Sequence, residues 1–232
     1  DATGNCSTSG TGYIWTVPSS ADANILALKV VNGAVTQKLA FDVSSYINVT
    51  GVGVDNIIQF YDTKNVTSYK CMLQMRGIGI YDITLNLNTQ KVVSCNKITD
   101  SNSNCMSLAA NIFTLQGHKF VVRNTRRIGS SAGAKNLCTE FEVLDITDSY
   151  TAPVSYGARD PFPNASVGAS TGSYIQTYVS GNVAKIYAYV MGGGVACYSF
   201  TATPKPVPVT NLNVTLVEDD DPNYIGRQNA EI

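Results

Sequence analysis

The sequence predicts an all-β fold, a four-unit β-propeller-like repeat of antiparallel four-stranded sheets. Short runs in which apolar and polar residues alternate recur along the 232 residues, whereas the spacing of an amphipathic helix is hard to find. Four strand–turn–strand segments also align with one another. When Leu28, Ile83, Leu144 and Phe200 are taken as equivalent positions, the segments recur at spacings of 55, 61 and 56 residues, as propeller blades do.

The first unit spans about residues 12–43 and contains three predicted strands. The run Tyr13–Val17, rich in aromatic and β-branched residues, comes first. A hairpin over residues 25–43 follows, and its first strand is the alternating run Ile25–Val30. Because each of the other units has a fourth strand, this opening unit is predicted to be incomplete.

Each of the other three units, at about residues 57–99, 111–160 and 174–215, contains four predicted strands, with two strands before a hairpin. The first strands are Ile57–Tyr61, Ile112–Leu115 and Tyr174–Tyr178, the second strands are Lys70–Met75, Lys119–Val122 and Lys185–Val190, and the hairpins span residues 81–99, 142–160 and 198–215. Residues 1–217 are therefore expected to form one repeat-built domain. Residues 218–232 are expected to be an acidic tail, or a strand that closes the first unit.

Packing explains why such units occur together. A four-stranded sheet with two apolar faces buries both of them only when neighbouring sheets cover them, as the blades of a propeller do. One or two β-sandwich domains of about 110 residues each are the alternative, because they also consist of many short strands separated by turns.

Short motifs in the third and fourth units resemble the LVIVD-type propeller repeat. The matching residues are Asp145, Pro153-Val154, Gly181-Asn182, Ala188-Tyr189-Val190 and Gly192-Gly193-Gly194. The resemblance covers residues 118–210 and fits the first half of the chain poorly. It implies a propeller, and families with this repeat commonly have more than four blades. Two arrangements therefore stay open, a compact four-bladed domain and an open set of blades completed by another copy.

Charge and polarity indicate the compartment. Asp, Glu, Lys and Arg make up 14% of the residues and the net charge is −1, so the basic face of a nucleic-acid-binding protein is not expected. No stretch approaches the eighteen or so apolar residues of a membrane-spanning helix. The chain starts at Asp1 without an initiating Met, as a secreted protein does once its signal peptide is removed.

Two sets of residues predict covalent modification in an extracellular setting. Five Asn-X-Ser/Thr sequons predict N-glycans at Asn5, Asn48, Asn65, Asn164 and Asn213. Six dispersed cysteines predict disulfide bonds, and they are Cys6, Cys71, Cys95, Cys105, Cys138 and Cys197. Cys95 and Cys105 flank a polar loop and form the first candidate pair, whereas spacing leaves the pairing of the other four open. With one histidine and no Cys-X-X-Cys pair, neither a metal site nor a cofactor is expected.

The only basic cluster consists of Arg123, Arg126 and Arg127. Strand alternation places the first and last of these on one face, from which they would bind a carboxylate or sulfate. Ordinary surface charge that balances Asp145 and Asp148 is the favoured interpretation.

No catalytic set is expected. His118 is predicted on a solvent-exposed turn or strand start, which weakens any Ser-His-Asp mechanism. Residues 219–221 are three aspartates without a calcium-loop pattern, so a solvated tail is favoured over a cation site. Glu140 and Glu142 share a strand face, but their spacing alone does not predict a glycoside hydrolase. Trp15 and the tyrosines are expected mainly in the core.

These observations favour a secreted, glycosylated, disulfide-bonded and non-enzymatic structural or adhesive protein of a cell surface or extracellular assembly. The incomplete first unit suggests self-association by strand donation, and an extracellular protein or glycan is the other expected partner. A carbohydrate-binding lectin that uses tyrosines and amides at one propeller rim is the alternative. A carbohydrate-active hydrolase is a more distant alternative.

Overall fold

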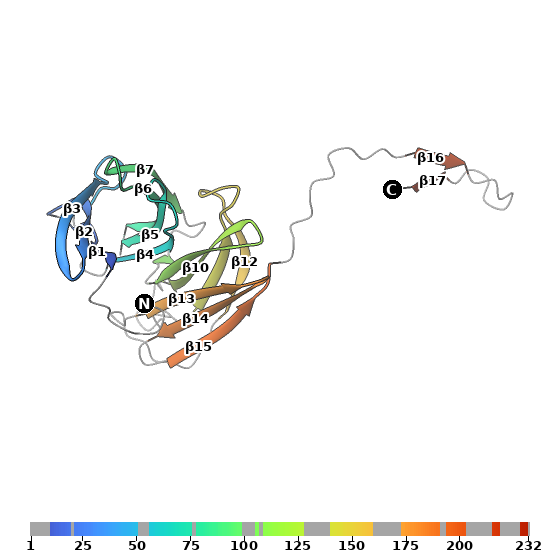
Figure 1. The fold of residues 1–232 in the computed structure, drawn as a ribbon. Coiled ribbons are helices and arrows are strands. Elements are labelled where there is room, and N and C mark those ends of the chain that lie inside the picture. Colours follow the sequence, from blue (N-terminus) through green and yellow to red (C-terminus); the bar gives the residue numbers. More distant parts are fainter. Residues whose placement is uncertain are drawn as a thin grey trace. The chain divides into compact units, whose positions relative to one another are not determined.

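A computed structural model describes residues 10–19, 21–50, 56–75, 78–98, 105–106, 109–127, 140–159, 173–190, 194–202, 215–218 and 228–231. The regular structure of these residues consists of β-strands, which confirms the predicted all-β fold (Figure 1). Residues 1–201 form one compact unit and residues 202–232 another, whereas we expected a boundary after residue 217. Among the described residues, no helix is long and apolar enough to cross a membrane.

The first sheet contains β1 (Thr11–Thr16), β2 (Asn24–Val31) and β3 (Ala34–Asp42) in that order, and it matches the predicted three-stranded opening unit. Asn32 and Gly33 join β2 to β3 with φ angles of 48° and 82°. Two consecutive positive φ angles are typical of the type I′ turn, whose twist matches that of two paired strands.

The second sheet is a meander of four strands, as predicted for residues 57–99. It contains β4 (Ile57–Asp62), β5 (Tyr69–Met75), β6 (Gly79–Asn86) and β7 (Lys91–Ile98), and each strand pairs with its neighbours in the sequence. All three pairings are antiparallel.

The third sheet repeats this meander and adds one short strand. Its strands are β9 (Ala110–Leu115), β10 (His118–Arg127), β11 (Glu140–Asp145) and β12 (Val154–Arg159), and β8 (Cys105–Met106) pairs with the end of β10. Gln116 and Gly117 form the turn before β10, again with positive φ angles of 52° and 81°.

The fourth sheet contains β13 (Ser173–Ser180), β14 (Val183–Val190) and β15 (Gly194–Phe200). The fourth strand predicted for this unit falls within residues 203–214, outside the described residues. In the unit of residues 202–232, β16 (Thr215–Glu218) pairs with β17 (Gln228–Glu231). The closing strand was expected through residues 223–225, which lie outside the described residues.

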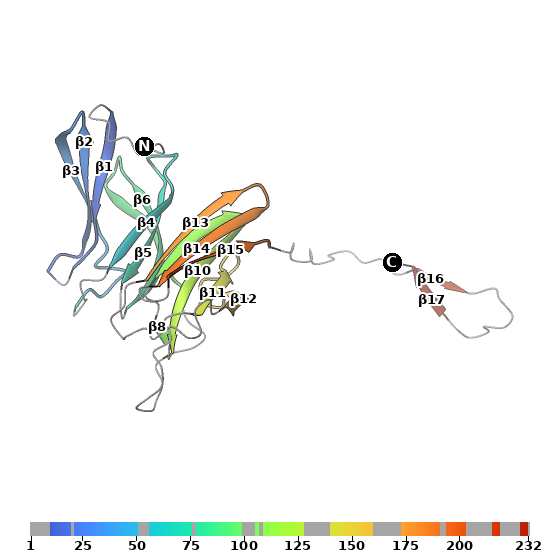
Figure 2. The ribbon, with the colours of Figure 1, turned by 90° about the horizontal axis from the view of Figure 1, so that it is seen from below.

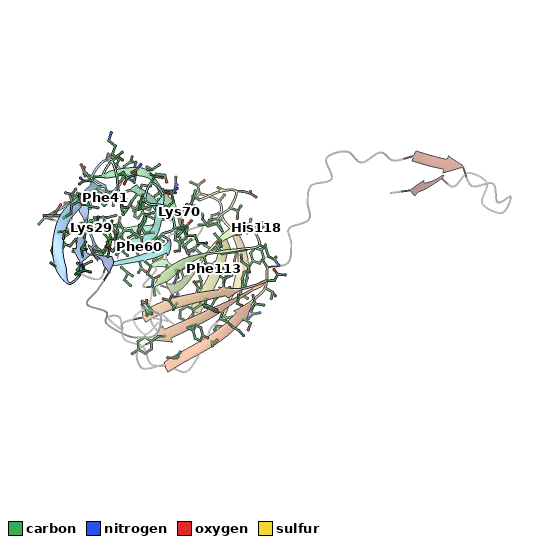
Figure 3. The ribbon with its side chains drawn as sticks, viewed as in Figure 1. Lys29, Phe41, Phe60, Lys70, Phe113 and His118 are labelled. Carbon is green, nitrogen blue, oxygen red and sulfur yellow. The ribbon has the colours of Figure 1, made fainter. Side chains whose placement is uncertain are left out.

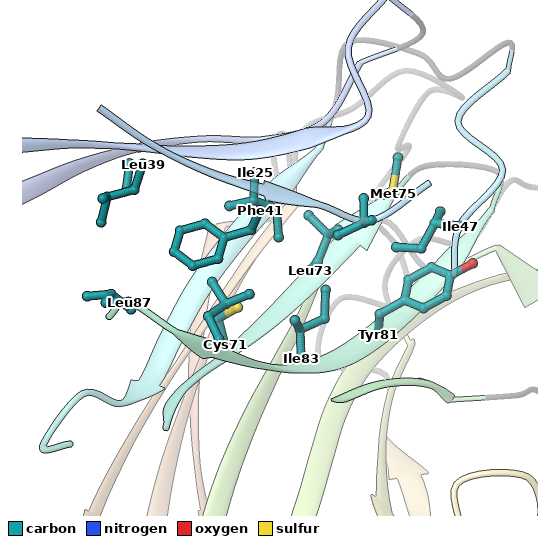
Figure 4. Close-up of a cluster of buried hydrophobic side chains, with 13 residues drawn as sticks. Ile25, Leu39, Phe41, Ile47, Cys71, Leu73, Met75, Tyr81, Ile83 and Leu87 are labelled. Carbon is teal, nitrogen blue, oxygen red and sulfur yellow. The ribbon is translucent and has the colours of Figure 1, made fainter. Parts of the chain in front are cut away.

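The four sheets of residues 1–201 stack face to face in chain order, which is the repeat architecture that the sequence predicted. Between the first and second sheets, Ile25 and Phe41 pack with Cys71, Leu73 and Ile83, all of them fully buried (Figure 4). On the same side, the ring of Trp15 lies 4.4 Å from that of Phe60, centroid to centroid.

The opposite face of the second sheet packs against the third sheet. Met72 and Ile80 of the second sheet share a buried cluster with Ile112, Val121 and Leu144 of the third. Strand alternation explains how one sheet serves two cores, because successive residues such as Cys71 and Met72 point to opposite faces.

Aromatic rings pack between the third and fourth sheets. The rings of Phe113 and Phe120 lie 6.0 and 5.1 Å from that of Phe200 on β15. Figure 2 shows the result from another direction, with the first sheet beside the second and the fourth against the third.

Candidate functional site

A buried carboxylate lies between the second and third sheets. Asp82 of β6 is 2% exposed and points away from the first sheet, toward β10. Its oxygens accept hydrogen bonds from the hydroxyls of Tyr61 and Tyr150 at 2.5 and 2.7 Å, and the Lys119 ammonium lies 2.7 Å away. These four residues, hereafter the Asp82 cluster, join β4 and β6 of one sheet to β10 and the segment after β11 of the next.

Electrostatics raise the pKa of the two tyrosines and the lysine of this cluster. Burial, followed by the Asp82 carboxylate, raises the pKa of both Tyr61 and Tyr150. Burial alone would lower the pKa of Lys119, but the hydrogen bond and the charge of Asp82 raise it above its ordinary value of 10.5. A general acid or base works best with a pKa near the working pH. The Asp82 cluster is therefore suited to holding two sheets together.

His118 begins β10, as predicted, but its side chain is partly buried and has a partner. His118 is labelled in Figure 3. Its Nδ1 lies 2.9 Å from the Asp145 carboxylate, and its ring stacks on Phe120. Burial would raise the pKa of Asp145, yet hydrogen bonds from Thr147 and from His118 hold it below its ordinary value. The dyad links the turn before β10 to the end of β11.

The predicted role of Arg123 as a surface charge near Asp145 and Asp148 is wrong. Arg123 is 3% exposed and pairs with Glu142 at 3.0 Å, because these residues lie opposite each other on β10 and β11. Ser155 of β12 donates a hydrogen bond to the other oxygen of Glu142. The strand does continue through Arg127, as the alternation argument assumed.

The remaining chemical candidates are only partly described. The side chains of Arg126, Arg127 and Glu140, and all of residues 192–193 and 219–221, lie outside the described residues. Within the described part of the chain, no group of three His, Cys, Asp or Glu side chains is placed to hold a metal ion.

The cysteines in the described residues do not form the expected disulfides. Cys71, Cys95 and Cys197 carry free thiols, so the predicted pair of Cys95 with Cys105 is not formed. Cys71 and Cys95 lie on either side of Ile83 on a common sheet face, two strand spacings or roughly 9.6 Å apart. A disulfide needs Cα atoms within about 7 Å. Cys6 and Cys138, and the side chain of Cys105, are outside the described residues.

Two of the five sequons fall in described segments, and both asparagines are exposed on turns. The Asn48 side-chain oxygen accepts a hydrogen bond from the amide of Thr50, and that of Asn65 accepts bonds from both the amide and the hydroxyl of Thr67. The positions Asn5, Asn164 and Asn213 lie outside the described residues.

A cavity of 390 Å³ lies where the first strands of the second, third and fourth sheets meet. It is lined by residues 59–61 of β4, 111–114 of β9 and 176–179 of β13. Gln59 and Asn111 each donate a side-chain hydrogen bond of 3.3 Å to the carbonyl oxygen of Ile175. Side-chain amides thus join the inner strands of three different sheets.

The fourth sheet leaves one face open to solvent. Ile175, Ala184 and Ile186 point to the third sheet and are buried. The opposite face, hereafter the tyrosine face, carries Tyr174, Tyr178, Tyr187, Tyr189 and Val195, which are between 41% and 67% exposed. The exposed side chains of Gln176, Lys185, Cys197 and Ser199 lie on the same face. Strand register places Tyr174, Tyr189 and Val195 in one row across the sheet.

Comparison with known proteins adds no identification. Neither a scan against models of protein families nor a search of curated proteins finds a match for this sequence. The resemblance to LVIVD-type repeats therefore stays a prediction. Its Gly181-Asn182 motif forms the turn between β13 and β14, and its Pro153-Val154 motif begins β12.

Sequence reasoning missed the Asp82 cluster, the amide-lined cavity and the tyrosine face. The first two depend on contacts between sheets, for which the sequence carries no local signal. The tyrosine face had a signal in the alternation of Tyr174 with Tyr178 and of Tyr187 with Tyr189. Alternation alone does not tell whether such a face is covered.

Proposed function

We propose that this protein is a secreted, N-glycosylated, non-enzymatic structural or adhesive protein of a cell surface or extracellular assembly, and that it self-associates through its end sheets. The exposed tyrosine face is the observation that carries the proposal. Stacked sheets and the LVIVD-like motifs together support a propeller-type repeat as the building block.

The size of the tyrosine face supports a contact surface. Four tyrosines that are each about half exposed leave roughly 400 Å² of ring surface in contact with water. An apolar patch of that size on a monomeric protein commonly marks an interaction site. Wherever two sheets of this chain face each other, their faces are packed together. The tyrosine face therefore suits packing against a further sheet.

A second copy supplies such a sheet. The outer face of the first sheet carries Ile14, Leu26, Leu28 and Val30 on the side opposite Trp15, and Ile14 is 56% exposed. Stacking this face on the tyrosine face of another copy is a heterologous contact, which generates rings or filaments. We place the contact on sheet faces because both end faces carry exposed apolar side chains.

Extracellular location is supported by the surface chemistry. Asn48 and Asn65 are exposed on turns and accessible to glycosylation. The free thiol of Cys71 is compatible with an oxidising compartment because it is completely buried, and burial raises its pKa, which keeps the reactive thiolate scarce. Loss of mass on enzymatic deglycosylation is expected, and an unchanged intact mass contradicts the glycosylation.

Matched charge substitutions test the self-association. Val195→Glu on the tyrosine face and Ile14→Glu on the first sheet are each expected to abolish the oligomers that mass photometry detects for the unmodified protein. Val93→Glu is the control, because Val93 is 58% exposed on the second sheet and belongs to neither face. An equimolar mixture of the Val195→Glu and Ile14→Glu variants retains one intact pair of faces, so it should form dimers and nothing larger.

Two results would overturn this contact. One is an unmodified protein that stays monomeric at all concentrations tested, and the other is an assembly that Val93→Glu disrupts as strongly as Val195→Glu. Disruption by Val195→Glu but not by Ile14→Glu excludes the first sheet as the partner surface and indicates a symmetric contact between two tyrosine faces.

A further inference from the structure

A second cavity, of 190 Å³, lies between the third and fourth sheets, where residues of β10, β11 and β12 face residues of β14 and β15. Phe120 of β10 and Phe200 of β15 meet between these sheets, with ring centroids 5.1 Å apart. Val122 and Tyr198 line the cavity, and each lies two residues along the strand from one of these rings. Because side chains two residues apart on a strand share a face, both point into the same space.

The walls of this cavity are apolar and partly aromatic. Phe141 of the third sheet and Ile186 of the fourth are buried in it. Tyr156 and Tyr198 are only partly buried, so the cavity has a side that is open to solvent. A cavity of about 150 Å³ with aliphatic and aromatic walls binds benzene in another protein, so this volume suits one aromatic ring with a short substituent.

Arg159 supplies the only charge among the residues that line the cavity. It pairs directly with Phe141 in the register of β11 and β12, so the two side chains lie on the same face of the third sheet. Arg159 is exposed, and its guanidinium donates one hydrogen bond, from Nη1 to the carbonyl oxygen of Ala158. Among the described residues it has no acidic partner.

The guanidinium therefore has N–H groups available for a ligand. A planar guanidinium matches a carboxylate, which it binds through two parallel hydrogen bonds. The apolar walls match the other end of such a ligand, since aromatic rings gain from edge-to-face and offset contacts with one another. Because Arg159 is exposed, the charged end of the ligand stays near water and avoids the cost of full burial.

We infer that this cavity binds a small aromatic carboxylate, with its ring in the apolar space between the third and fourth sheets and its carboxylate paired with Arg159. Burial of the ring supplies affinity, and the guanidinium selects the charge. The inference does not depend on self-association, because Phe141, Arg159 and Tyr198 belong to neither of the proposed contact faces.

Saturation-transfer NMR and calorimetry with phenylacetate and benzoate as probes test the site. At least one probe is expected to bind, and Arg159→Gln should weaken its binding by about tenfold or more, since a hydrogen-bonded ion pair is lost. Lys38→Gln is the matched control, because it removes one positive charge from an exposed position on β3 of the first sheet, and it should leave binding unchanged. Circular dichroism and Trp15 fluorescence verify that both variants are folded.

Two further ligands separate the contributions of the charge and the ring. Phenylacetamide keeps the ring and lacks the charge, so it should bind about tenfold more weakly than phenylacetate, and Arg159→Gln should not change its binding. Acetate keeps the carboxylate and lacks the ring, so it should not displace phenylacetate. Intermolecular nuclear Overhauser effects from the ring protons of phenylacetate to the methyl groups of Val122 and Ile186 are expected to locate the ligand.

Four results would overturn the inference. The first is folded protein that binds neither aromatic carboxylate, and the second is equal binding by the Arg159→Gln and Lys38→Gln variants. The third is phenylacetamide that binds as well as phenylacetate, or acetate that displaces it. The fourth is a set of Overhauser effects that connects the bound ring to residues outside this cavity.

Discussion

Asp82 is a buried charge whose hydrogen-bond and ion-pair partners offset the cost of its burial. The residue lies in the apolar interface of the second and third sheets, where an unpaired carboxylate would be strongly unfavourable. Two phenols and one ammonium surround it, so its negative charge is hydrogen-bonded and neutralised. Its stabilising effect therefore depends on every partner being present.

Replacing Asp82 by Asn is expected to lower the free energy of unfolding by about 3 kcal/mol. The substitution removes the counter-charge and leaves the Lys119 ammonium partly buried beside a neutral amide. Urea unfolding followed by circular dichroism measures the loss. Asp62→Asn is the control, because the Asp62–Lys70 pair is longer, at 3.5 Å, and about a third exposed, so its loss should stay below about 1 kcal/mol. Equal losses of unfolding free energy in the two variants would show that the contacts of Asp82 stabilise the protein no more than an exposed ion pair does.

The raised pKa values of the Asp82 cluster predict a loss of stability in alkali. Tyr61 and Tyr150 keep their protons in the folded protein at pH values at which the unfolded chain, with an ordinary tyrosine pKa of 10.0, releases them. Lys119 acts in the same direction. The folded state then binds more protons than the unfolded state, so the free energy of unfolding falls as the pH rises above about 10.

Urea midpoints between about pH 9 and about pH 11.5 measure this effect. Tyr61→Phe removes one of the titrating groups, so its stability should fall less steeply with pH, by up to about 1.4 kcal/mol per pH unit. Tyr46→Phe is the control, since Tyr46 is exposed and outside the cluster. An unchanged pH slope in Tyr61→Phe contradicts the assignment.

At the scale of elements, tight turns set the register of the hairpins. The turn between β9 and β10 places Gly117 at a φ of 81°, a conformation that residues with a Cβ rarely adopt. The space around Gly117 is open, so steric clash does not contribute. His118 follows directly, which means that this turn also positions the imidazole against Asp145.

Gly117→Ala is expected to destabilise the protein by about 1 kcal/mol, through backbone strain alone. Gly12→Ala gives a matched comparison, because Gly12 also has open space around it but lies in extended β1 without a positive φ. We expect its effect to stay within about 0.5 kcal/mol. Thermal unfolding of both variants measures the difference, and equal effects would rule out a role for the φ angle.

Most strands were predictable because each carries its own signal. Alternation in runs such as Ile25–Val30, Ile57–Tyr61 and Lys185–Val190 identified strands that the structure contains with similar bounds. Partners across sheets were not predictable. Lys119 and Asp82 are 37 residues apart on strands that do not pair. Arg123 was assigned to nearby aspartates because composition does not reveal strand register. The register places Arg123 opposite Glu142.

At the scale of the whole molecule, the sheets form a series in which inner and outer members differ. The second sheet is covered on both faces, whereas the fourth is covered on one. Stacks of repeated units open from their ends, because each unit is stabilised mainly by its direct neighbours. The same arrangement leaves the end faces available for another copy.

Hydrogen–deuterium exchange is expected to reveal this difference in stability between the inner and outer sheets. Amides of β14 should exchange at least tenfold faster than those of β5, although each is a central strand that is hydrogen-bonded on both sides. Mass spectrometry of peptides that cover the two strands measures the rates. Indistinguishable protection would show that residues 1–201 open as one cooperative body.

The position of Trp15 allows its fluorescence to measure whether a structural change in one sheet reaches the other sheets of the stack. It is the sole tryptophan of the sequence, and it lies in the interface of the first and second sheets, against Phe60. Its emission therefore reports on one end of the series and on nothing else. An event at the fourth sheet changes that emission only when it is transmitted through the third sheet or through the hydrogen bond of Gln59 to Ile175, which joins the second sheet directly to the fourth. A single optical signal therefore separates sheets that behave independently from sheets that respond together.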